Sequence, residues 1–328
     1  MCRLGGPGEG SVVVVVQTVA LKSKTPYGQR MPPVPIGQLL RIMPDVVRQC
    51  IATAFQRRSA PRGRPPEWLR AASDIRLVGI RGADGSVVRF DAPRLGDVAS
   101  VVYEQRELFP SRPDPDDTGF DLLGDVLREV TARNENSDRF DQHLLRNLKR
   151  FGRVINGHFQ EMLVSGRRYS IRSPAVMDRE TLSAAASLYL KTPPPRRARV
   201  VGRLDAVGIS TQTFSLKLDD GHEVRGVLSD GQLGPLLELF ASQQRVVVRG
   251  DAVFRPSGQL LLIDADDIGS AVGESAIWSK APEPAAGRMD VQALRRRQGP
   301  RSGLAAIVGR WPGDETEEEV EAALGALS

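Results

Sequence analysis

Apolar and polar positions alternate along much of the stretch from Arg199 to Asp267, and this pattern predicts five strands. In the second of them Phe214, Leu216 and Leu218 are separated by polar residues, as in a strand with one buried face. Asp219-Asp220-Gly221 then supplies the residue types of a tight hairpin turn, because glycine tolerates the positive φ that such a turn needs. Leucines at helical spacing interrupt the alternation after the third strand. The predicted order is strand, strand, strand, helix, strand, strand.

This order of elements resembles that of an OB-fold barrel. The resemblance implies a small closed barrel that binds another molecule; an open meander or an SH3-like barrel is the alternative. Barrels that bind single strands do so through exposed aromatic residues and a cationic groove. Here the predicted strands carry only two aromatic residues, Phe214 and Phe254, and residues 196–269 carry 9 Lys and Arg against 10 Asp and Glu. The composition therefore favours a barrel that contacts protein or has a purely structural role over one that binds nucleic acid.

Upstream of the barrel, the pattern mixes strand and helix signals and predicts an α+β domain. A Val-rich strand over 12–22 precedes a helix over 36–57, and Pro44 is expected to kink or split that helix. The further predicted elements are a strand pair over 75–80 and 87–90, helices over 119–133 and 138–156, a hairpin over 158–172 and a helix from Asp178. The predicted fold class is α+β, with an N-terminal α+β domain, a small five-stranded OB-like barrel and a short helical tail.

Proline-rich and polar stretches suggest the boundaries between these parts. Three consecutive prolines at 193–195 favour an extended spacer. The predicted division is a flexible lead over 1–10, the α+β domain over 11–192, a Pro/Arg spacer over 193–198, the barrel over 199–269, a flexible linker over 270–301 and an amphipathic helical tail over 302–328.

Composition is that of a globular protein, with 41% hydrophobic residues among 328. Two cysteines do not form a disulfide framework, which favours a reducing cytoplasm. The apolar run at 11–21 is too short to span a bilayer, so no membrane contact is expected. Arginine outnumbers lysine 39 to 6, a bias consistent with a GC-rich bacterial genome.

The positive charge is concentrated in the N-terminal part, where residues 1–195 carry 29 Lys and Arg against 21 Asp and Glu. A cationic stripe on the predicted helix over 138–156 could follow phosphates, and cations of the predicted hairpin could extend it. The nucleic-acid-binding candidates are Arg146, Lys149, Arg150, Arg153, Arg167, Arg168 and Arg172. The competing interpretation is an amphipathic surface helix with a solvated basic face.

Catalytic and metal-binding motifs are absent from the sequence. The three histidines are scattered, there is no CxxC or HExxH pattern, no GxSxG and no P-loop. The prediction is a non-enzymatic protein with no cofactor and no metal.

The tail combines an apolar helical stripe with a capping-box pattern at Thr316 to Glu319. Its segment Gly309 to Glu319 resembles the tails of uncharacterised, antitoxin-like bacterial proteins. The resemblance implies that Trp311, Val320, Leu324 and Leu327 contact a protein partner; docking of the tail onto its own chain is the alternative.

Three functional hypotheses follow. The first is an intracellular bacterial interaction protein that contacts a macromolecule through its barrel or tail. The second is nucleic-acid binding through the basic helix. The third is an antitoxin-like regulator of a neighbouring gene product.

Overall fold

A computed structural model describes residues 13–24, 27–60, 63–82, 86–104, 112–155, 157–229, 232–273 and 278–284. Contacts place residues 1–285 in one compact unit. The tail residues 302–328, with their predicted helices, lie outside the described residues. Helices and strands alternate irregularly along the chain, and the α+β class is confirmed.

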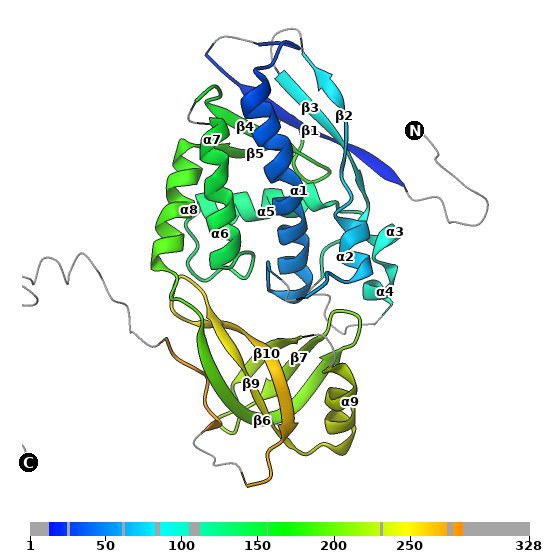
Figure 1. The fold of residues 1–328 in the computed structure, drawn as a ribbon, viewed down its shortest axis with the longest axis vertical. Helices are drawn as coiled ribbons and strands as arrows, with labels where there is room; N and C mark the ends of the chain where they lie inside the picture. Colours follow the sequence, from blue (N-terminus) through cyan, green and yellow to red (C-terminus); the bar gives the residue numbers. More distant parts are fainter. Residues whose placement is uncertain are drawn as a thin grey trace, which may run out of the picture. The chain divides into compact units, whose positions relative to one another are not determined.

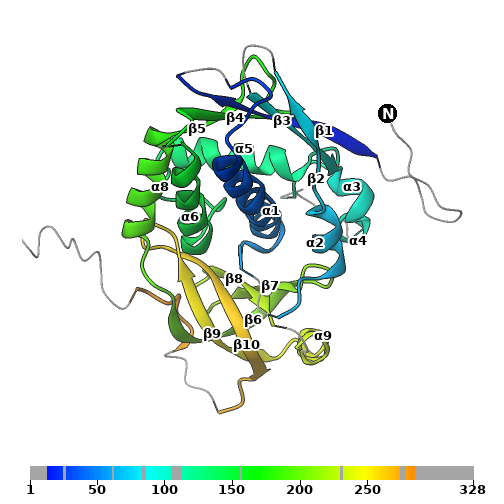
Figure 2. The same cartoon turned by 45° about the horizontal axis from the view of Figure 1, so that its top comes forward.

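A five-stranded antiparallel sheet forms the first half, with the order β2-β3-β1-β4-β5. Its strands are β1 (Val14–Lys22), β2 (Arg76–Arg81), β3 (Ser86–Pro93), β4 (Glu161–Ser165) and β5 (Ala175–Asp178). Alternate residues of the central strand, such as Val19 and Leu21, are buried, because one face of the sheet packs on helices. Figures 1 and 2 show α1 and α5 on the same side of this sheet.

The helices of this half surround one long central helix, α1 (Pro33–Gln56). Pro44 lies inside α1 without dividing it into two helices. One side of α1, including Met43 and Ile51, is fully buried, and this packing holds the helix together although Pro44 lacks an N–H. The other helices are α2 (Glu67–Ala72), α3 (Leu95–Val98), α4 (Ser100–Tyr103), α5 (Gly119–Thr131), α6 (Gln142–Leu148), the 3₁₀ turn η1 (Lys149–Phe151), α7 (Gly152–Ile155) and α8 (Arg179–Lys191).

Two predicted elements differ from the structure. The helix expected over 138–156 begins only at Gln142, because the Asp141 side chain caps it, and a 3₁₀ turn divides it before α7. In the hairpin expected over 158–172, the second strand is instead Ala175–Asp178. The intervening residues Arg167 and Arg168 bind carboxylates near α5 and so do not pair as a strand.

The second half is a closed barrel with the order β10-β8-β7-β6-β9. Its elements are β6 (Arg196–Gly208), β7 (Thr213–Lys217), β8 (Glu223–Leu228), α9 (Leu233–Ser242), β9 (Arg245–Phe254) and β10 (Leu260–Ser270). Strands β8 and β10 are parallel and the other neighbours antiparallel. The closed barrel, with its helix after the third strand, is compatible with the predicted OB-like module.

No helix in the described ranges is both long and apolar enough to cross a membrane.

Candidate functional site

The cations predicted on the helix over 138–156 lie on α6, η1 and α7. Figure 1 shows α6 and α7 beside α1. Arg146, Lys149 and Arg153 are exposed, and Arg150 is half-buried. The apolar residues between them, including Leu148 and Phe151, are fully buried in the core. The helical segments therefore present their cations outward, as the sequence predicts.

Two of these cations contact uncharged partners. Arg146 Nη2 donates to His143 Nδ1 at 2.7 Å. Burial lowers the pKa of His143, and Arg146 lowers it further, so the imidazole is neutral at pH 7 and accepts this bond. Lys149 Nζ lies 4.6 Å from the centre of the Tyr189 ring. Because neither partner is an anion, both contacts leave the positive charge uncompensated.

Helix α1 adds two cations, Arg41 and Arg48, to the same region of the surface. Asp45 lies between them on the helix and is 2.9 Å from Arg48 and 3.8 Å from Arg150. The Asp45 carboxylate thus forms ion pairs with two guanidinium groups. We call the six cations together the basic face: Arg41, Arg48, Arg146, Lys149, Arg150 and Arg153. Among the described residues, Asp45 is the only carboxylate in ion-pair contact with them.

Arg167 and Arg168, predicted to extend this surface, lie beyond the other end of β4 and bind acids near α5. Arg168 binds Asp125 through two hydrogen bonds, at 2.9 and 2.8 Å, and its Nε lies 3.1 Å from Asp117. Arg167 contacts Asp114 at 2.6 Å and Asp117 at 3.1 Å. Their charges are therefore balanced by carboxylates of the same chain.

The acids in these pairs have perturbed pKa values. Burial raises the pKa of Asp117, against the influence of the two arginines. The Asp116 backbone N–H, together with Arg167, lowers the pKa of Asp114. Such a network fixes the β4–β5 connection to α5, and this favours a structural role for both arginines. Arg172, in the same connection, is exposed.

The barrel contacts the helical half through two of its loops. In the loop between β6 and β7, Ser210 O accepts from Trp68 Nε1 at 3.1 Å, and Thr211 O accepts from Gln56 Nε2 at 3.0 Å. In the loop between β9 and β10, Ser257 N donates to Glu135 O at 3.1 Å. The two loops are thus occupied by residues of the same chain.

Side chains of the β9–β10 loop and of β10 strengthen this contact. The Arg255 guanidinium binds Asp138, at 2.7 Å from Nε and 2.5 Å from Nη2. On β10, the buried Asp264 lies 2.5 Å from Arg58, which is also buried. Both pairs join the barrel to residues near the start of α6 and the end of α1.

The aromatic residues of the barrel strands are not available for base stacking. Phe214 and Phe254 are 4% and 0% exposed and belong to the barrel core. Two cations of the strands, Arg225 and Arg249, lie beside Glu223 and Asp267 at 3.4 and 2.6 Å. The described strands of the barrel therefore carry no exposed aromatic residue of the kind on which strand-binding barrels stack bases.

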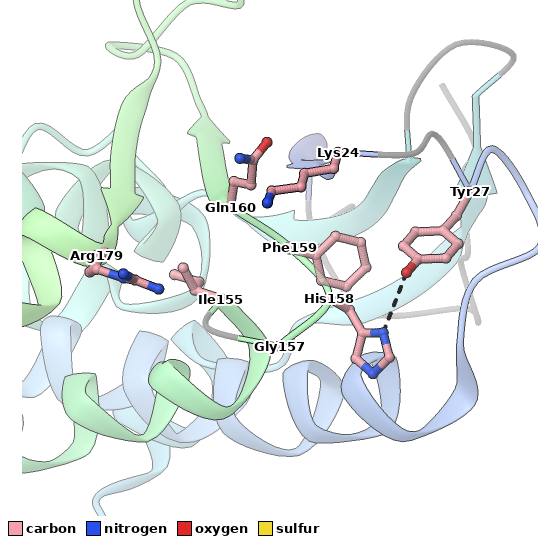
Figure 3. Close-up of a pocket in the computed structure, with 8 residues that line it drawn as sticks. All are labelled: Lys24, Tyr27, Ile155, Gly157, His158, Phe159, Gln160 and Arg179. Carbon is pink, nitrogen blue, oxygen red and sulfur yellow. Dashed lines mark hydrogen bonds between the residues drawn. The ribbon is translucent and has the colours of Figure 1, made fainter.

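A cavity that sequence reasoning missed lies where β1 ends, β4 begins and α8 begins (Figure 3). Its volume is about 580 Å³, and Lys24 and Arg179 are among its lining residues. These two residues are 155 positions apart and no local motif links them. Only the pairing of β1 with β4, and of β4 with β5, brings them to one cavity.

The tail residues Trp311, Val320, Leu324 and Leu327, predicted to bind a partner, lie outside the described residues. Within the described ranges, no group of three or more His, Cys, Asp or Glu side chains is placed to hold a metal ion.

Comparison with protein-family models, curated proteins and solved structures gives no match to the chain.

Proposed function

We propose that this chain binds nucleic acid through the basic face. The observation that carries the proposal is six cations on neighbouring helices with Asp45 as their one carboxylate partner in the described structure. Exposed cations at helical spacing bind phosphates without reading sequence, because each contact releases counterions from the nucleic acid. Phosphate contact without sequence specificity is the interaction that this surface favours.

We further infer that the barrel is an OB-fold that contacts its own chain. Its order, with β8 parallel to β10 and a helix between the third and fourth strands, supports that assignment. OB-folds bind oligonucleotides through the loops between strands one and two and between strands four and five. Here these loops contact Trp68, Gln56 and Glu135. The barrel loops therefore contact the helical half, and the basic face is the surface that we assign to nucleic acid.

Binding of fluorescent duplex and single-stranded DNA over a salt series tests the proposal. Arg146→Gln/Arg153→Gln removes two cations that have no acidic partner in the described structure. We expect weaker binding and a salt slope that is shallower by about 2, since each phosphate contact contributes about 0.9 on duplex DNA.

The matched control is Arg203→Gln/Lys217→Gln, which removes two exposed cations from the barrel and changes the net charge equally. The control is expected to bind like the wild-type protein. Absence of binding at low salt, or an equal loss in the control, would reject the basic face as the binding surface.

A second candidate function, contact with a protein partner, is favoured by α9. Of its ten residues only Leu236 is buried, and Glu238 is the only charged one. Leu237 and Phe240 are 36% and 38% exposed, an apolar surface of the kind found in protein interfaces.

Co-expression with the neighbouring gene product tests this candidate and the antitoxin-like alternative together. Leu237→Glu/Phe240→Glu should release a partner held by α9, whereas deletion of 303–328 should release one held by the tail. Unchanged co-purification of both variants would remove both surfaces as the contact.

A further inference from the structure

The cavity of Figure 3 lies outside the basic face and is formed by three segments. Lys24 and Tyr27 come from the chain after β1, residues 157–160 from the turn before β4, and Arg179 from the first position of α8. The Gln160 N–H donates to Lys22 O at 2.7 Å and so fixes the turn against the end of β1. A volume of about 580 Å³ suits a small organic ligand.

The charge of this cavity is positive. Lys24 and Arg179 line it, and none of the described residues around it is acidic. In Figure 3 the Lys24 ammonium extends toward Gln160 and the Arg179 guanidinium toward Ile155. Neither cation makes an ion pair or a side-chain hydrogen bond with the described residues.

Two acids near the cavity in sequence already have partners. Glu161 lies 2.5 Å from Lys22, and Asp178 Oδ1 accepts from the backbone N–H of Thr181 at 2.8 Å as the cap of α8. These contacts engage the carboxylates next to Gln160 and on the N-terminal side of Arg179, whereas Glu180, on the other side of Arg179, is exposed and does not line the cavity. The two cavity cations are thus available to an anion from solution.

An aromatic wall completes the cavity. Tyr27 packs edge to face on Phe159, which is 2% exposed, with ring centres 5.8 Å apart. The Tyr27 hydroxyl lies 3.4 Å from His158 Nδ1, and the two rings are 6.3 Å apart. The buried phenylalanine supports this wall, whose rings offer a surface on which a flat group can pack.

We propose that this cavity binds a phosphate monoester, with Lys24 and Arg179 as the cations that contact the phosphate. A phosphate monoester carries close to two negative charges at pH 7 and presents three acceptor oxygens. The two cations and the side-chain amide of Gln160 can donate hydrogen bonds to these oxygens. The aromatic wall suits a nucleobase, so the ligand class is a nucleotide. The phosphate comes either from a free mononucleotide or from the end of a nucleic-acid strand, and both sources present the same group.

Calorimetric titration of the full-length protein with AMP, and separately with adenosine, tests the proposal. We expect AMP to bind and adenosine to bind at least about tenfold more weakly, because it lacks the phosphate. Lys24→Gln/Arg179→Gln should weaken AMP binding by about tenfold or more, since it removes two charge-assisted contacts. Both residues are exposed, so the double variant is expected to keep the circular dichroism spectrum of the wild-type protein.

The barrel variant Arg203→Gln/Lys217→Gln is the charge-matched control and should bind AMP normally. Equal affinity for AMP and adenosine, no AMP binding, or an equal loss in the control would overturn the proposal. A 5′-phosphorylated and a 5′-hydroxyl oligonucleotide distinguish the sources. Preference for the phosphorylated strand that Lys24→Gln/Arg179→Gln abolishes assigns the cavity to strand ends, and AMP binding without that preference assigns it to free nucleotides.

The outcome is independent of the basic face. Arg146→Gln/Arg153→Gln should leave AMP affinity unchanged, whereas Lys24→Gln/Arg179→Gln should leave the salt slope on 5′-hydroxyl DNA unchanged. Failure of nucleic-acid binding and failure of phosphate recognition therefore give different results.

Discussion

Asp125 illustrates how one buried carboxylate can organise a loop. It is 8% exposed and accepts both hydrogen bonds of the Arg168 guanidinium as well as one from the Tyr169 hydroxyl at 2.7 Å. Gly124, the preceding residue, has no side chain because an added Cβ would lie 2.3 Å from the Tyr169 ring. Close packing of Gly124 on Tyr169 and charge pairing of Asp125 with Arg168 thus occur at neighbouring residues.

Asp125→Asn is expected to lower the free energy of unfolding by about 2 kcal/mol, because the buried carboxylate that accepts from both Arg168 and Tyr169 loses its charge. The control Asp116→Asn alters an exposed ion pair with Arg94 and should cost less than about 1 kcal/mol. Urea denaturation at pH 7 measures both. A similar loss in the two variants would contradict the role given to Asp125.

Cys50 is expected to be unreactive in the folded protein. Its side chain is 1% exposed, and burial raises the pKa of the thiol far above its ordinary value of 9.0. A raised pKa keeps the thiol protonated at pH 9, where an exposed cysteine is about half ionised and reacts. In a Cys2→Ser variant, a thiol-specific chromogenic reagent at pH 9 should detect no thiol before denaturation and one thiol after it. Rapid reaction of the native variant would contradict this expectation.

At the scale of elements, Gly250 marks a close approach of β9 to β10. A Cβ on Gly250 would lie 2.2 Å from the Asp264 carbonyl oxygen and 2.7 Å from the Ala265 Cα. Both atoms belong to the backbone, so neither can rotate away. The next pair along these strands, Asp267 with Arg249, follows a register shift.

Gly250→Ala should therefore destabilise the protein by about 2 kcal/mol or more, because the strands must separate to accept the methyl group. Gly269→Ala on the facing strand is the matched control, since a Cβ there meets nothing within 4 Å. Thermal unfolding of the two variants measures the difference. Equal melting temperatures would show that the barrel can absorb the added group.

The sequence predicted those elements whose determining interactions are local. The alternation around Phe214 and the turn chemistry of Asp219 to Gly221 identified the β7–β8 hairpin of the barrel, and Asp178 marked the start of α8. The hairpin predicted over 158–172 was right in its first strand, but its second strand lies at Ala175–Asp178. Arg168 instead binds Asp125, a partner 43 positions away that no local pattern reveals. The basic face was partly predictable from helical spacing. The cavity was not, since Lys24 and Arg179 meet only through strand pairing.

At the scale of the whole described unit, the helical half and the barrel are joined by charges as well as by loops. Arg58 and Asp264 form a buried pair between the end of α1 and β10. Asp138 accepts from Arg57 on one side and Arg255 on the other. Such pairs stabilise one arrangement of the helical half and the barrel, because breaking a buried pair leaves an unpaired charge.

We expect the protein without the tail, residues 1–285, to unfold in one calorimetric transition. Arg58→Met/Asp138→Asn removes two ionic links between the halves and should split that transition into two. The control Arg76→Met/Asp74→Asn disrupts an exposed pair within the helical half and should leave one transition. Two transitions in the unmodified protein would show that the links are too weak to couple the halves.

The occupied loops of the barrel weaken the binding of any outside ligand that uses them. Trp68 and Gln56 are tethered to the barrel by the chain itself, so they compete for Ser210 and Thr211 as though present at roughly millimolar concentration. A ligand that bound the same loops would first have to displace Trp68 and Gln56. Under the proposed OB-fold assignment, the loops that bind oligonucleotides in other OB-folds are bound here by residues of α1 and α2, and freeing them requires separating the barrel from those helices.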